Sequence, residues 1–65
     1  MSAFEEQELL QKAAESAGRL TGRLRQDEAE LSEAGMTDAC RLAAAAAGAA
    51  AEVEAELRRA EPRVR

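Results

Sequence analysis

Hydrophobic residues recur along this chain with helical spacing in two segments, which a glycine separates. In the first segment, positions seven residues apart hold Leu10, Ala17, Leu24 and Leu31, as in one column of a heptad repeat. The companion column holds Ala13, Leu20 and Ala34. In the second segment, one arc of a helical wheel gathers Ala39, Leu42, Ala46, Ala49, Val53, Leu57, Ala60 and Val64. No strand-like alternation occurs, so the pattern predicts an all-α protein.

The ends of the first helix are marked by residues with strong positional preferences. Ser2 and Glu5 have the spacing of a capping box, in which each side chain accepts a hydrogen bond from the other residue's amide. We therefore expect a helix over about 3–34. Gly35 follows it and is expected to end it in the left-handed conformation that glycine adopts easily.

A second helix is expected over about 38–61, with Thr37 or Asp38 as its N-cap. Pro62 cannot continue a helix, so a short tail over 62–65 is predicted after it. The turn over 35–37 is short enough to make the two helices antiparallel neighbours. The whole chain, 1–65, is predicted to be a single αα-hairpin that completes a bundle with a second copy or a partner.

The helix–helix contact of this hairpin, called the seam below, should bury the larger apolar residues of both arcs. Large side chains would then alternate with small ones across it. The residues expected in the seam are Leu10, Ala17, Leu20, Leu24, Leu31, Leu42, Val53 and Leu57.

The second helix carries another uncharged column, called the small-residue stripe: Cys40, Ala44, Ala47, Gly48, Ala51 and Ala55. With Leu42 and Val53 turned inward, this stripe would lie on the outside of the hairpin. We interpret it as the interface for a helical partner, because alanine and glycine let helices approach closely. The alternative is that alanine is present only as the best helix former. Gly48 favours the interface, because a mid-helix glycine destabilises a helix and needs a packing reason.

Composition indicates that the hairpin cannot build a large core. Hydrophobic residues are 46% of the chain, but seventeen of them are alanine. Burying alanine contributes far less free energy than burying leucine or valine, while ordering each residue has a similar entropic cost. A chain of this size therefore needs a partner or a second copy for stability.

The net charge of −4 comes from 13 acidic and 9 basic residues in mixed order. Such a chain has no broad positive surface, so neither nucleic acid nor a membrane is expected as a partner. The single cysteine cannot form an internal disulfide, and the start "MSAFEEQELL" lacks the basic and apolar regions of a signal peptide. We expect a cytoplasmic protein.

The residues that carry most enzyme chemistry are scarce. The chain has no His, Tyr or Trp and one Cys, so neither a Cys–His pair nor a Cys/His zinc site can form. No glycine-rich phosphate loop is present. The sequence predicts a protein that is not an enzyme and has no catalytic, metal or cofactor site.

Two families of helical hairpins share features with this chain. The segment "ELSEAGMTDAC", with Asp38 and Cys40, resembles the turn of the plasmid copy-number RNA-binding proteins, which dimerise as four-helix bundles. That resemblance implies dimerisation but not RNA binding, because acids or leucine stand where the family has its basic and aromatic RNA face. "EAG" at 33–35, the Thr37–Asp38 start and the alanine-rich second helix resemble the small helical-hairpin co-chaperones of type III secretion needle subunits. This second resemblance implies a helical-repeat chaperone as the partner.

Three functions follow as hypotheses. The first is a non-enzymatic adaptor or co-chaperone that docks a helical partner through the small-residue stripe. The second is a self-associating protein, a homodimeric four-helix bundle that acts as a scaffold or regulator. RNA binding is the third and the least supported.

Overall fold

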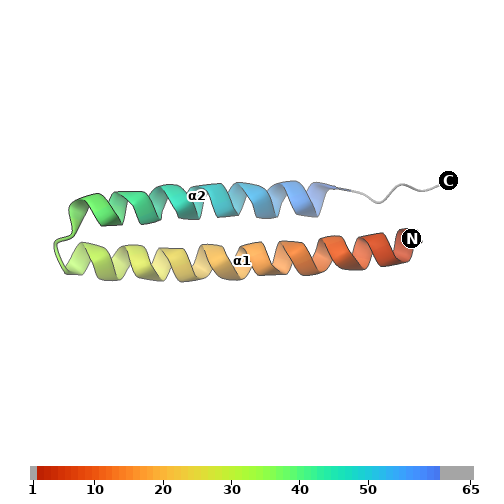
Figure 1. Cartoon of the computed structure of the whole chain (residues 1–65), viewed down its shortest axis with the longest axis horizontal. Helices are drawn as coiled ribbons and strands as arrows, with labels where there is room; N and C mark the ends of the chain where they lie inside the picture. The colour runs from red at the N-terminus through yellow and green to blue at the C-terminus, as the bar shows by residue number, and fades with distance from the viewer. Residues whose placement is uncertain (1, 61–65) are drawn as a thin grey trace.

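The computed structural model describes residues 2–60, which form two antiparallel α-helices joined by a short turn (Figure 1). Helix α1 spans Ala3–Glu33 and helix α2 spans Thr37–Arg59. The helices lie side by side along α2, and the N-terminal end of α1 extends beyond it. Residues 2–60 contain no strand. The prediction of an all-α helical hairpin is confirmed.

Helix α1 begins with the predicted capping box. The Glu5 amide donates a hydrogen bond to Ser2 Oγ at 3.1 Å, and the Ser2 amide donates one to Glu5 Oε1 at 2.9 Å. The amide of Ser2, and then its hydroxyl group, lower the pKa of the Glu5 carboxyl below its ordinary value of 4.5. These bonds satisfy amides that have no partner within the helix.

The turn after α1 depends on Gly35, which has a φ of +76°. The Met36 amide donates to the Leu31 carbonyl and the Gly35 amide to the Ser32 carbonyl, each at 3.0 Å. This pair of bonds defines a Schellman motif, which ends a helix with a residue in the left-handed conformation. The predicted role of Gly35 is confirmed.

Helix α2 begins one residue before the expected position. Met36 is its N-cap and makes no side-chain capping bond, so the assignment of Thr37 or Asp38 as N-cap is wrong. The Schellman motif ends at Met36, and the chain enters α2 at the next residue, so Thr37 is already helical. At the far end α2 stops at Arg59, because Ala60 is extended. The expected end at 61, Pro62 and the tail over 62–65 lie outside the described residues.

The fully buried part of the fold is small. Among residues 2–60, the buried hydrophobic side chains are those of Ala14, Ala47 and Ala50. The radius of gyration is 15.3 Å, whereas a compact domain of this length has about 11 Å. The hairpin is thus a single layer of two helices held by close contact between small side chains, and the described residues include no third element to cover its leucines.

On α1, the column Leu10, Ala17, Leu24 and Leu31 is half-buried. Its companion in the seam is the column Ala14, Thr21 and Glu28, four residues on, rather than the expected column that contains Leu20. Leu20 is 53% exposed, so its assignment to the seam is wrong. Turning Ala14 rather than a leucine toward α2 lets the two backbones come closer.

On α2 the orientation differs more strongly from the expected one. Leu42 is 73% exposed and Val53 is 51% exposed, whereas Ala47 is 0% exposed. The inward orientation expected for Leu42 and Val53 is therefore wrong, although Leu57 is half-buried. Two helices alone share only a narrow strip, where small side chains bring more atoms into van der Waals contact than bulky side chains that hold the helices apart.

Candidate partner interface

The small-residue stripe of α2 lies in the hairpin and not on its outside. Ala47 is fully buried against α1, and the other five members are half-buried: Cys40, Ala44, Gly48, Ala51 and Ala55. The expectation that this stripe is open to a partner is therefore wrong for this fold. The tendency of small residues to bring helices together was predicted correctly, but the helix that they meet is α1 of the same chain.

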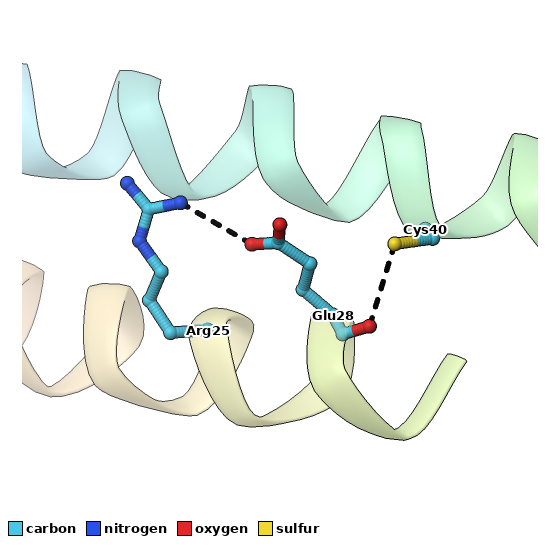
Figure 2. A network of polar contacts seen from close by, with 3 residues as sticks. All are labelled: Arg25, Glu28 and Cys40. Atoms are coloured by element: carbon cyan, nitrogen blue, oxygen red, sulfur yellow. Dashed lines mark hydrogen bonds and ion pairs between the residues drawn. The ribbon is translucent and has the colours of Figure 1, made fainter. Parts of the chain in front are cut away.

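Cys40 shows this orientation directly. Its thiol donates a hydrogen bond to the main-chain carbonyl oxygen of Glu28, at 3.4 Å across the seam. The carboxylate of Glu28 in turn pairs with Arg25 Nη1 at 3.2 Å (Figure 2). The hydrogen bond from Cys40 holds α2 against the last turns of α1 near the connecting turn.

A second contact sets the register further along the hairpin. A Cβ atom added to Gly18 would lie 3.0 Å from Glu54 Oε2, so the end of the Glu54 side chain covers this glycine. Together with the Cys40–Glu28 bond, this contact places Leu20 about level with Ala50, and Leu24 about level with Ala46. Large residues of α1 therefore stand beside small residues of α2.

Gly48 does not have the packing reason that the sequence suggested. A Cβ atom added to it would meet nothing within 4 Å. The same holds for Gly22 on α1. The close approach of the helices depends on alanine rather than on either of these glycines.

One side of the hairpin is apolar. Successive helical residues turn by about 100°, so Ala13 and Leu20 flank the seam column of α1, and Ala46 and Val53 flank that of α2. The two helices are antiparallel and face each other, and both flanks consequently lie on the same side. We call this side the apolar face: Leu10, Ala13, Ala17, Leu20, Leu24 and Leu31 of α1, and Ala46, Ala50, Val53 and Leu57 of α2. Leu42 lies at its outer edge.

The opposite side, called the polar face, carries Gln11, Glu15, Arg25, Arg41 and Arg58. Arg58 Nη2 pairs with Glu54 Oε2 at 2.9 Å, and Arg25 pairs with Glu28 as described above. Both pairs lie along the polar edge of the seam. Exposed ion pairs of this kind stabilise a fold only slightly, but they show which side of the hairpin suits water.

Two acidic residues interrupt the apolar face, Glu6 near the open end and Asp27 near the turn. Asp27 Oδ1 is paired with Arg23 Nε at 3.2 Å. The stretch between these two acids is uncharged on this face and contains the half-exposed Leu20. A partner surface is therefore best sought between them.

The sequence identified the apolar arc of α2, but the prediction that this arc packs against α1 was wrong. The signal that could have given the correct orientation is the difference in side-chain size between the two apolar sides of α2. The small-residue stripe fits a close contact with one antiparallel helix, whereas Leu42 and Val53 fit the wider space between four helices. A helical-wheel projection of α2 alone does not show which of these two sides packs against α1.

Residues 2–60 offer few side chains that could form a site of another kind. They contain no group of three or more His, Cys, Asp or Glu side chains that could hold a metal ion. Neither α1 nor α2 combines the length and the hydrophobicity that crossing a membrane would require. Comparison with known families, characterised proteins and solved structures finds no match for this chain.

Proposed function

We propose that this protein is a non-enzymatic interaction module that binds a helical partner through its apolar face. The observation that carries the proposal is the half-exposure of Leu20 and Val53 on one side of a hairpin whose own core is alanine. Exposing leucine and valine to water costs free energy that docking against another helix would recover. The site of action that we propose is the cytoplasm.

The division of the hairpin into two faces supports this function. An amphipathic surface of this kind, with helical anchors at regular spacing, is the usual receptor or ligand in helix-to-helix recognition. Charged side chains on the polar face keep that side in water and limit docking to the other. Two kinds of partner fit this face: a larger helical protein, as for a needle co-chaperone, or another hairpin of the same kind.

The experiment compares two neighbouring alanines that are both exposed in the hairpin, Ala46 on the apolar face and Ala45 just outside it. Each is replaced by cysteine in a Cys40→Ser background, and labelling by a membrane-permeant maleimide is followed in cells that produce the protein. We expect Ala46→Cys to react about tenfold more slowly than Ala45→Cys, because only the dissociated fraction would be open to the reagent.

Equal labelling rates at these two positions in cells would show that the apolar face is open to solvent, and the proposal would be wrong. The matched pair controls for helix formation, because both variants change an exposed alanine of α2 by one sulfur atom. Loss of the fold would accelerate both reactions together and is therefore distinguishable from loss of a partner.

A further inference from the structure

We infer that the occupant of the apolar face is a second copy of this chain, so that the protein is a homodimeric four-helix bundle with both turns at the same end. This inference rests on the proposed function, since it names the partner for the same face. It is carried by the way in which large and small residues alternate across that face.

The alternation follows from the register of the hairpin. The contacts between Cys40 and Glu28 and between Glu54 and Gly18 align α1 with α2. They bring each large side chain of the apolar face to the level of a small one on the other helix. The pairs at common levels are Leu20 with Ala50, Leu24 with Ala46, and Val53 with Ala17.

A two-fold axis parallel to the helices converts this internal alternation into a fit between two copies. Such an axis keeps every residue at its own level and lays α2 of the second copy over α1 of the first. Leu20 and Leu24 of one copy then meet alanines of the other, and each Val53 meets an Ala17. An interface of this symmetry uses the same patch twice, and must therefore complement itself.

The size of the face is sufficient for a stable dimer. From Leu10 to Leu31 it is about 30 Å long, at about 1.5 Å per residue, and two packed helices are about 20 Å wide. The projected area is thus roughly 600 Å², and the corrugated accessible surface is larger. A standard interface buries about 800 Å² on each partner.

At the turn end of the face, charge does not oppose this association. Asp27, the acid on the face near the turn, is already paired with Arg23 of its own chain. In the dimer it would lie at the level of Ala43 of the second copy, where no acidic side chain faces it. The polar faces of the two copies point away from each other into water.

The experiment measures the mass of the purified chain by sedimentation equilibrium at about 100 µM, far above the micromolar or tighter dissociation constants usual for such an interface. We expect twice the 6.9 kDa of one chain. Leu20→Glu should raise the dissociation constant roughly hundredfold by burying an unpaired carboxylate. The control Ala29→Glu, on the polar side, should change it by less than about threefold.

Orientation is read from a spin label at Glu33→Cys in the Cys40→Ser background. Turns at the same end predict a distance within about 30 Å, whereas opposite ends predict roughly 40 Å, from the rise of α1. A monomeric mass, a larger oligomer, or the longer distance overturns the inference. If the purified chain is monomeric while Ala46→Cys is protected in cells, the second copy is rejected and the proposed function stands. A dimer in which Ala46→Cys labels freely rejects both.

Discussion

The thiol of Cys40 donates a hydrogen bond to the carbonyl oxygen of Glu28, at 3.4 Å across the contact between the two helices. This single relationship defines which side of α2 faces α1. It turns the column that contains Cys40 and Ala47 inward and leaves Leu42 and Val53 outside. The surface available for a partner is consequently a face of leucine and valine, and the alanine column serves the hairpin itself.

Cys40 should be protected from thiol reagents by the hairpin alone. At a concentration where circular dichroism shows both helices intact, we expect its labelling to be roughly tenfold slower than in urea, because reaction requires local opening. The control is Ala45→Cys in a Cys40→Ser background, which should label at nearly the same rate with and without urea. If Cys40 in the folded chain reacts as fast as in urea, the inward orientation of this column is wrong.

Enlarging Ala47 should destabilise the hairpin, because this residue has no exposed surface. Overpacking of a tight contact raises the free energy of the folded state by about 1–3 kcal/mol, so we expect a loss of that size for Ala47→Leu. Ala45→Leu, on the exposed side of the same helix, should stay within about 0.5 kcal/mol of the parent. Urea denaturation followed by circular dichroism gives both values. An equal effect of the two substitutions would contradict the assigned seam.

Two glycines with open space around them should respond to alanine in opposite directions. Gly48 lies within α2, so Gly48→Ala is expected to stabilise the fold by about 0.5–1 kcal/mol. Gly35 has a φ of +76°, and Gly35→Ala should therefore cost about 1–2 kcal/mol, the penalty of a side chain in the left-handed region. Thermal unfolding of both variants checks the signs. A destabilising Gly48→Ala would show instead that another chain packs against this glycine.

The start of α1 should weaken in acid. The hydrogen bonds from Ser2 lower the pKa of Glu5 in the folded chain below its ordinary value of 4.5. A group with a lowered folded pKa stabilises the fold above its unfolded pKa, and this contribution is lost as the pH falls through the folded pKa. We expect a nuclear magnetic resonance titration of the Glu5 carboxyl to show the lowered pKa and fraying of residues 3–6 in the same range. Ser2→Ala removes the hydroxyl but keeps the amide, so it should return the pKa part of the way toward 4.5, and an unchanged value would disprove the role of the hydroxyl.

The sequence determined the parts of this fold that depend on local preference. Ser2 and Glu5 specify the start of α1 through bonds between residues three apart. Gly35 specifies its end, because few other residues adopt a positive φ without strain. The seven-residue spacing of Leu10, Ala17, Leu24 and Leu31 specifies that a helix of this length has an inward side. Each of these features is set within a few residues of chain.

Only the tertiary structure decided how α2 is rotated and hence which surface a partner can use. Both the column through Ala47 and the column through Leu42 and Val53 are apolar, so hydrophobicity alone allows either to face α1. Which column faces α1 depends on the distance between the two helix axes, and that distance cannot be read from either segment alone. A close approach requires small residues along the contact surfaces of both helices, such as Ala14 on α1 and Ala47 on α2, and these surfaces form only when the two helices pack against each other.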